Sequence, residues 1–380
     1  MYFSDVIGHE AIKKRLLSNA GDNRISHAQL FLGHQASGAL PLALAYARYI
    51  QCRDKGLEDA CGKCPSCLKF NKYEHPDIHF IFPTSTNKEH KDRDKISSKL
   101  FLAYWRKLLI EKPYFDYFDW LEAIEIENKQ ANISAEDCND IIRTLSLKSY
   151  ESPYKIMIIY MVEKLNYAAA PKLLKIVEEP PGNTLFLMVS ENKDRIISTI
   201  LSRTQVLKVP LPQVAEVAQA LINKYGFDHK KATRSAFMAD SIITDALRLI
   251  RAGDKHMADF DSFREWMRFC FKNDTAKILK WAEKTARDGR EKQKSFLQYG
   301  LKIFRLCLLN NYNVNDLVRL EDEERSFLEG FSPYINHHNA VDVIAAFNTA
   351  IFHLERNANP RIIFADLSFQ LSRLMHVKSS

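Results

Sequence analysis

The sequence contains no long uninterrupted apolar run. Its longest apolar stretches, such as Ile156–Val162, are far too short to cross a bilayer. The first residues, Met1–Leu17, mix apolar and charged side chains and have no continuous apolar core, so they do not form a secretory signal. Internal repeats and low-complexity tracts are absent as well. We therefore expect a folded cytoplasmic protein with no membrane partner.

Composition excludes fewer classes of protein. The hydrophobic fraction of 46% and the charged fraction of 27% are those of an ordinary globular protein and exclude a disordered chain. A length of 380 residues exceeds a single hydrophobic core, so more than one domain is expected. The net charge of +7 favours contact with a polyanion such as nucleic acid, but proteins without such partners carry similar charges.

Short apolar segments alternate with helical patterns over residues 1–210. The candidate strands are rich in Ile, Val, Phe and Leu and are bounded by glycine, proline or polar residues, as buried parallel strands are. They are Gln29–Leu32, Asp77–Phe82, Lys155–Val162, Thr184–Ser190 and Gln205–Val209. The fold predicted for this region is a three-layer α/β domain with a parallel sheet.

Helical periodicity replaces the strand patterns beyond Pro210–Pro212. Residues 211–254 are predicted to form a small helical unit, and residues 255–380 a larger one. The last helix is the best marked, because Asn359 can cap its N-terminus and Pro360 suits its first position.

One segment, residues 84–131, interrupts the α/β alternation. It combines a helical stretch, Ile96–Ile110, with a cluster of aromatic residues: Tyr114, Phe115, Tyr117, Phe118 and Trp120. One interpretation is an inserted helical hairpin whose aromatic side chains pack against the domain, since such clusters usually form core. The other is a contact surface for a partner protein or for nucleic acid.

A phosphate-binding loop without its catalytic end follows the first strand. Gly33 and Gly38 have the spacing of such a loop. Ala39, however, stands where a lysine would reach the phosphates, and Leu40 stands where a hydroxyl would hold Mg²⁺. The chain is therefore not expected to hydrolyse ATP with this loop. A plain strand-to-helix turn is the alternative, and weak nucleotide binding through backbone N–H groups stays open.

The second half of the nucleotide site is missing too. An ATPase of this type carries acidic residues at the end of a second apolar strand, where they hold Mg²⁺ and orient water. Here the strand Lys155–Ile159 is followed by Tyr160 and Met161. Two separate losses make an unusual but active loop a poor explanation.

Four of the seven cysteines crowd into one short segment: Cys52, Cys61, Cys64 and Cys67. A Cys-x-x-Cys turn lets two thiolates converge on one ion, and the other two cysteines can complete a tetrahedral shell. Such a shell leaves no position for water, so the predicted site holds a structural zinc ion. Reduced free thiols and an iron–sulfur cluster are the alternatives, while a cytoplasmic chain argues against disulfides.

Arg203 stands in a short connection before the last strand, in the triplet Ser202-Arg203-Thr204. An arginine on a loop is usually a solvated surface charge. The alternative is an arginine finger, a planar cation that enters the nucleotide site of a neighbouring subunit and stabilises charge in phosphoryl transfer. The residues alone leave both interpretations open.

Several segments keep the order found in one known family. They are Phe3–Glu10, Ser26–Gly33, Cys52–Cys67, His75–Asp77, Leu173–Pro181, Ser202–Thr204 and Arg356–Arg361. Together they resemble the delta-prime family of bacterial DNA polymerase III clamp-loader subunits. The ATPase subunits of the same loader share these segments, and the lost loop residues favour the delta-prime family over them. The family's Ser-Arg-Cys triplet reads Ser-Arg-Thr here, which keeps the arginine.

The resemblance implies an AAA+ P-loop domain, a helical lid and an all-α collar over residues 1–210, 211–254 and 255–380. It implies a heteropentamer with the gamma or tau ATPase subunits and delta, which loads the sliding clamp onto primer-template DNA during DNA replication. The chain would have no catalytic activity alone but would be part of the DNA-directed DNA polymerase holoenzyme, a nucleotidyltransferase complex. Arg203, with Ser202 beside it, would act as a finger in trans. Zinc would be structural, and ATP would not be hydrolysed.

Two other functions stay open. One is an active or weakly active AAA+ ATPase subunit of the gamma/tau type, which ATP hydrolysis by the purified chain would reveal. The other is a zinc-containing nucleic-acid-binding protein, which would bind DNA alone with a steep salt dependence.

Overall fold

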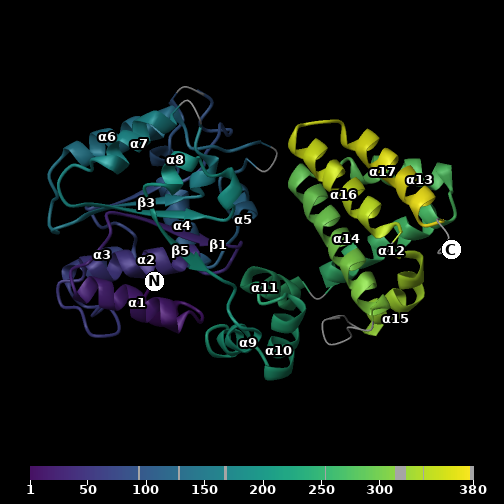
Figure 1. Cartoon of the computed structure of the whole chain (residues 1–380), viewed down its shortest axis with the longest axis horizontal. Helices are drawn as coiled ribbons and strands as arrows, with labels where there is room; N and C mark the ends of the chain where they lie inside the picture. Colours follow the sequence, from purple (N-terminus) through teal and green to yellow (C-terminus); the bar gives the residue numbers. More distant parts are fainter. Residues whose placement is uncertain are drawn as a thin grey trace. The chain divides into compact units, whose positions relative to one another are not determined.

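The computed structural model describes the chain outside residues 93–94, 127–128, 167–168, 253, 313–321, 337 and 377–380. Side chains at 252, 254–259, 291 and 322–323 also lie outside the description. The chain forms two compact units, Met1–Arg248 and Leu249–Ser380 (Figure 1). Each unit has a hydrophobic core of its own. The finer division at residues 210 and 254 stays a prediction.

Within the described residues, five strands form one parallel sheet in the order β2-β3-β4-β1-β5. They are β1 (Ala28–Gly33), β2 (Ile78–Ile81), β3 (Lys155–Tyr160), β4 (Thr184–Ser190) and β5 (Gln205–Val209). β3 and β4 are buried along their whole length, which explains their nearly continuous apolar sequences. All five predicted strands are confirmed, and the largest difference in bounds is at β3, which ends at Tyr160 rather than Val162.

Helices cover both faces of this sheet, as Figure 1 shows. On one face lie α1 (Glu10–Gly21), α2 (Ala39–Gln51) and α3 (Pro65–Asn71), and on the other α6 (Ala135–Ser146), α7 (Ala170–Glu178) and α8 (Ser198–Leu201). Short 3₁₀ turns are η1 (Phe3–Asp5), η4 (Val162–Lys164) and η5 (Lys193–Arg195). Alternate residues of β3 serve the two faces: Ile158 packs in the core beside α2, whereas Met157 packs beside α6 and α7. The predicted three-layer α/β fold is confirmed.

The inserted segment folds as η3 (Ser98–Phe101), α4 (Leu102–Glu111) and α5 (Tyr117–Ala123). Trp105 lies stacked on Phe82 at a centroid distance of 4.4 Å and edge-on to Trp120 at 5.1 Å. Both tryptophans and Phe115 belong to the core on the α2 side of the sheet. The interpretation of the aromatic cluster as packing is therefore confirmed for these residues.

Three helices, α9 (Val214–Asn223), α10 (His229–Met238) and α11 (Ile243–Ala252), follow the last strand. The second unit is helical in its described part: α12 (Asp254–Phe271), α13 (Thr275–Thr285), α14 (Arg290–Asn311), α15 (Asp322–Phe331), α16 (Ala340–Glu355) and α17 (Pro360–Leu374), with η7 (Ser332–Tyr334). Trp266 and Trp281 stack in its core at 4.5 Å. α17 begins as predicted, because the Asn359 side chain accepts a hydrogen bond from the N–H of Arg361 at 3.0 Å. In the described part of the chain, no helix is both long and apolar enough to cross a bilayer.

Candidate functional site

The loop after β1 turns sharply into α2 through two residues with positive φ. Gly38 has a φ of 96°, and Ala36 takes the left-handed region at 56°, where glycine is easier to accommodate. A Cβ on Gly33 would lie 2.2 Å from Ser37 Oγ and 2.5 Å from the Val209 carbonyl, so only glycine fits there. Gly33 and Gly38 thus form a tight turn from β1 into α2 at the carboxyl end of the sheet, and its interpretation as a degenerate phosphate-binding loop stays a prediction.

The groups that act on a nucleotide are replaced by buried apolar and aromatic side chains. Ala39 and Leu40 are both 6% exposed and belong to the core. Tyr160 ends β3, and its hydroxyl has no hydrogen-bond partner among the described residues. Burial raises the pKa of Tyr160, so the hydroxyl is neutral. The next acid along the chain, Glu163, accepts a hydrogen bond from the N–H of Glu191 at 2.9 Å.

The insertion reaches into this same place. Pro113, Tyr114 and Phe115 line the cavity over the loop, which has a volume of about 30 Å³. A cavity of this size holds about two water molecules, whereas ligand sites usually measure roughly 300–1,000 Å³. The Phe115 ring packs against Tyr160 at a centroid distance of 5.7 Å. The walls of this small cavity thus come from the loop, the insertion and the ends of the neighbouring strands.

Arg203 lies in the turn between α8 and β5 and is held by its own chain. Its Nε donates to a carboxylate oxygen of Glu178, the last residue of α7. Its Nη1 donates to the carbonyl of Thr199 at 3.0 Å and to Ser202 Oγ at 3.2 Å. The side chain is still 37% exposed. Arg203 and Ser202 thus lie together at the surface, with the guanidinium fixed in direction.

The loop and Arg203 lie at opposite ends of the parallel strands. Parallel pairing sets Gln205 against Gln29 and Val209 against Gly33. The loop therefore follows the carboxyl ends of the strands, and Arg203 precedes the amino end of β5. At about 3.3 Å per residue, the four steps from Gln205 to Val209 separate the two ends of β5 by roughly 13 Å. Arg203 cannot act on a group bound in its own loop.

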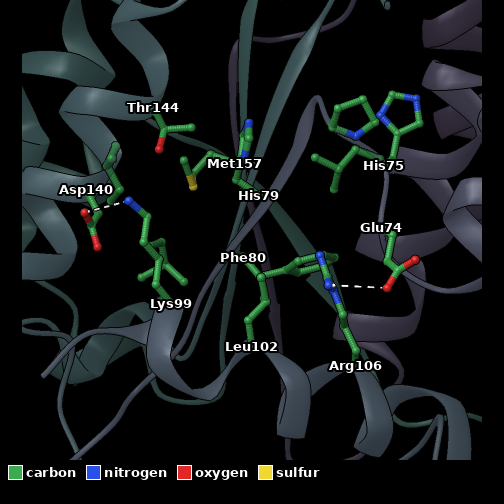
Figure 2. A pocket seen from close by; sticks show the side chains of 14 residues that line it. Glu74, His75, His79, Phe80, Lys99, Leu102, Arg106, Asp140, Thr144 and Met157 are labelled. Carbon is green, nitrogen blue, oxygen red and sulfur yellow. Dashed lines mark hydrogen bonds and ion pairs between the residues drawn. The ribbon is translucent and has the colours of Figure 1, made fainter. Parts of the chain in front are cut away.

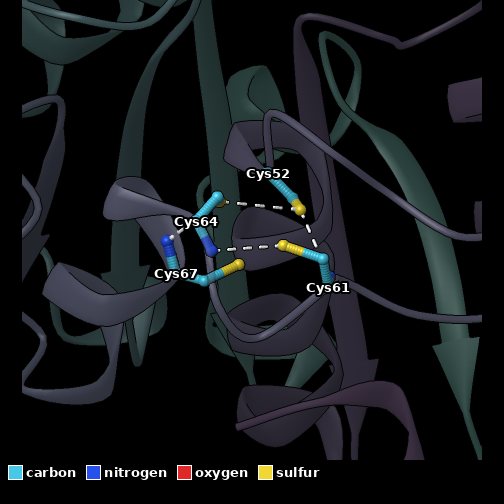
Figure 3. A group of neighbouring side chains, drawn as sticks. All are labelled: Cys52, Cys61, Cys64 and Cys67. Carbon is cyan, nitrogen blue, oxygen red and sulfur yellow. Dashed lines mark hydrogen bonds between the residues drawn. The ribbon is translucent and has the colours of Figure 1, made fainter.

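The four clustered cysteines come together beside α2 and α3 (Figure 3). All four sulfurs lie within 4.8 Å of one another, and Cys52 Sγ lies 4.0 Å from Cys64 Sγ. Zn–S bonds of about 2.3 Å would place tetrahedral sulfurs roughly 3.8 Å apart. The cluster could therefore hold a metal ion with little movement.

Backbone N–H groups favour a thiolate at Cys64, whereas burial raises the pKa of Cys52 and raises that of Cys67 to about 12. N–H groups of Cys61, Cys64 and Cys67 each point at the sulfur of another cluster cysteine, at 3.3–3.5 Å. Burial by itself would raise the pKa of Cys64, but the N–H groups of Cys67 and Arg53 and the neighbouring thiols lower it to about 6. The buried guanidinium of Arg48 donates to the Cys67 carbonyl at 3.3 Å. This is the donor set that zinc prefers.

A larger cavity, of about 200 Å³, opens beside the edge strand β2 (Figure 2). Its charged groups pair with each other: Lys99 with Asp140 at 2.8 Å, and Arg106 with Glu74 at 3.5 Å. Burial lowers the pKa of His79, which faces this cavity, to about 4, so its imidazole is neutral. The sequence gives no signal for this cavity, since its lining comes from β2, the insertion and α6.

Two features of the loop region escape sequence reasoning. The Tyr114 hydroxyl accepts a hydrogen bond from the N–H of Ile7 at 2.7 Å. Arg248 of α11 pairs with Asp116 at 2.5 Å and with Asp119 at 3.2 Å. The only signal in the sequence is the aromatic cluster of the insertion, which predicts packing but not its location.

Comparison with known proteins identifies the family. Residues 8–213 match the family described as DNA polymerase III, delta subunit. The chain belongs to this family. The matched range includes the loop, the cysteine cluster, the insertion and Arg203. The chain is a member of the clamp-loader family.

Individual relatives support the same assignment. The chain is 25% identical to DNA polymerase III subunit delta' of Bacillus subtilis over 213 residues, which are 56% of this chain and 51% of that protein. It is 27% identical to subunit delta' of Haemophilus influenzae over 50% of this chain and 45% of that protein. It is also 23% identical to subunit tau/gamma of Haemophilus influenzae over 68% of this chain and 32% of that protein. The chain thus spans about half, or less, of the length of these relatives.

A solved structure of a DNA polymerase III gamma subunit-related protein from Thermotoga maritima covers 95% of this chain and 99% of that chain. It is 13% identical, with a TM-score of 0.38, which is too low to support an argument.

Proposed function

We propose that the chain is the delta-prime subunit of a clamp loader, that it has no ATPase activity of its own, and that it supplies Arg203 to a neighbouring ATPase subunit. In this role it helps to place the sliding clamp on primer-template DNA. Its partners are the gamma or tau subunits and delta, in a heteropentamer.

The small cavity over the loop after β1, called the cradle below, supports the lack of ATPase activity. Ala39 and Leu40 cannot contact phosphates or Mg²⁺ as lysine and threonine do. The cavity over them, about 30 Å³, is far smaller than the usual ligand site. Tyr160 fills the position where an acid would hold Mg²⁺.

The position of Arg203 carries the proposal. It precedes the amino end of β5, whereas the loop follows the carboxyl ends of the strands. A finger that serves another subunit must be exposed and must point away from its own nucleotide site, and both conditions hold for Arg203. Hydrogen bonds to Thr199 and Ser202 fix its guanidinium, so little side-chain freedom remains to be lost when a neighbour docks.

A structural zinc ion in the cysteine cluster completes the proposal. Zinc bound by Cys52, Cys61, Cys64 and Cys67 would hold in place the loop that connects α2 to α3. The purified chain should contain about one zinc ion, and Cys64→Ser should lose it while Cys138→Ala, a buried cysteine outside the cluster, keeps it. Iron in place of zinc, or no metal in a folded chain, would contradict this assignment.

Reconstitution with the ATPase subunits, delta and the clamp tests the function. Arg203→Ala should lower DNA-stimulated ATP turnover by about tenfold or more, because fingers supply at least that much. Lys208→Ala, an exposed cation on β5, is the matched control and should leave turnover unchanged.

Two results would overturn the proposal. Turnover in the Arg203→Ala assembly equal to wild type would remove the finger. ATP hydrolysis by the purified chain alone would favour an active ATPase subunit of the gamma/tau type instead.

A further inference from the structure

Tyr114, in the insertion, contacts both the loop after β1 and the N-terminal segment. Its ring lies 3.9 Å from the position that a Cβ would take on Gly38, at the start of α2. Its hydroxyl accepts the N–H of Ile7 at 2.7 Å, although 107 residues separate the two. His9 also lies beside Gly38, and its Nε2 is 2.6 Å from the Ser37 carbonyl. One phenol thus joins the insertion, the N-terminal segment and the loop.

The residues that follow Tyr114 carry two buried carboxylates. Asp116 caps α5 by accepting the N–H of Asp119 at 2.8 Å, and Asp119 accepts the N–H of Asp116 at 3.1 Å. This reciprocal cap brings two like charges side by side, with the Asp116 side chain only 2% exposed. Such a pair is costly to bury unless cations compensate it.

Arg248 of α11 supplies that compensation from outside the insertion. One of its nitrogens, Nη2, lies 2.5 Å from Asp116 and 3.2 Å from Asp119. Lys112 adds a second cation, with its Nζ 3.1 Å from Asp119 Oδ1. Burial would raise the pKa of Asp119, but Arg248, the Asp116 N–H and Lys112 outweigh it and hold that pKa below its usual value. Asp119 therefore stays charged, whereas burial raises the pKa of Asp116 in spite of Arg248, and the contacts of Arg248 with both side chains keep α11 attached.

The opposite side of the same helical group contacts the N-terminal segment. Lys224, just after α9, donates to the carbonyl of Ser4 at 3.3 Å and lies 3.9 Å from the Asp5 carboxylate. Glu216 of α9 lies against Gly8 so closely that a Cβ there would approach its carboxylate to 2.5 Å. Residues 4–8 and 116–119 thus hold α9–α11 at two separate points, and the Tyr114–Ile7 hydrogen bond joins these points.

We propose that residues 112–119 act as a resident occupant of the nucleotide site, in which Tyr114 and Phe115 fill the cradle while Asp116 and Asp119 clasp Arg248 and so fix α9–α11 to the large domain without nucleotide. This role deepens the proposed function and rests on it, since a silent subunit needs another way to hold these helices. A bound nucleotide can dissociate, whereas residues 112–119 are part of the chain and hold these helices at all times.

Hydrogen exchange on the full chain tests the clasp. Arg248→Ala should raise the exchange rate of backbone amides in α9–α11 by about tenfold or more, because local opening follows the loss of the contacts that close it. Amides of β3 and β4 should exchange as in wild type. Arg251→Ala, an exposed cation on the same helix, is the matched control and should change nothing.

A double variant separates the clasp from general stability. Arg248→Ala leaves Asp116 buried without its cation, while Lys112 still pairs with Asp119, and this loss destabilises the unit as a whole. Adding Asp116→Asn removes that carboxylate and should restore the thermal midpoint toward wild type while α9–α11 still exchange fast. Wild-type exchange of α9–α11 in both variants would overturn the clasp.

Nucleotide tests the occupancy. In wild type, Mg²⁺–ATP at millimolar concentration should leave the exchange of residues 33–40 and of α9–α11 unchanged, because the cradle is full. Protection of the loop by ATP would overturn the proposal. Neither arm measures ATP turnover by a neighbour, so these results are independent of the result with Arg203→Ala.

Discussion

The nucleotide loop and the Arg203 turn lie at opposite edges of one sheet and are built in opposite ways. The loop is closed: Ala39, Leu40 and Tyr160 are buried, and the insertion fills the space above them. The turn is open: Arg203 is 37% exposed and is held only by polar contacts. The carboxyl ends of the strands thus lead into buried core, whereas the amino end of β5 carries an exposed cation, Arg203. Substitutions at the first should affect stability, and substitutions at the second should affect activity.

Tyr160→Ala should give the largest stability change in this comparison. Removing a fully buried aromatic ring between Trp105 and Phe115 leaves a cavity and should lower the free energy of unfolding by about 3–5 kcal/mol. Urea denaturation measures this change. Tyr160→Phe should stay within about 1 kcal/mol of wild type, because the lost hydroxyl has no partner. A loss below about 1 kcal/mol in the alanine variant would contradict the closed cradle.

Glu178→Ala should have an intermediate effect, on turnover. Without its carboxylate partner, Arg203 regains side-chain freedom that docking must then remove, at about 1 kcal/mol, or roughly fivefold in kcat. Steady-state ATPase measurements on the reconstituted assembly would detect this as a fall in kcat with unchanged KM. Glu179→Ala, its exposed neighbour, is the control. A rise in turnover would mean that Glu178 restrains the arginine rather than positioning it.

Arg203→Ala should have a still smaller effect on stability. The side chains of its ion pair with Glu178 are 37% and 42% exposed, and such surface pairs contribute about 0–1 kcal/mol. Thermal or urea unfolding of the variant should therefore match wild type closely. A loss of about 3 kcal/mol would mean that Arg203 is a structural residue and would weaken the contrast between the two edges.

Restoring the lost loop residues should have no effect on nucleotide binding. Ala39→Lys combined with Leu40→Thr recreates the phosphate-binding sequence, but Tyr114 and Phe115 still fill the cradle. Titration with a fluorescent ATP analogue should show no saturable binding up to millimolar concentration. Micromolar binding by this variant would mean that the missing side chains, and not the insertion, keep nucleotide out.

Local features of this fold are readable from the sequence. The strands are short apolar runs whose bounds are set by the residues that flank them, and the cysteines converge because their spacing is short. The loss of loop chemistry at Ala39 and Leu40 is equally local. The N-cap of α17 at Asn359 needs only its own neighbours.

The contacts that close the cradle are not local. Tyr114 meets Ile7 across 107 residues, and Arg248 meets Asp119 across 129. Neither the periodicity of the sequence nor the spacing of its residues predicts which carboxylate an arginine will pair with when the two are so far apart in the chain. The aromatic cluster of the insertion indicates packing, but only the fold shows that the packing fills the nucleotide site. For the same reason the Arg203–Glu178 pair, 25 residues apart, has no signature in the sequence.

The rate of one turnover of prebound ATP in the assembled complex tests the central claim most directly, because it separates chemistry from assembly and binding. Replacing Arg203 by alanine is predicted to lower this rate by at least about tenfold, because arginine fingers in other proteins accelerate phosphoryl transfer by about 10³–10⁵-fold. The amount of ATP bound before the turnover should be the same in both assemblies. An unchanged rate in the Arg203→Ala assembly would contradict the account.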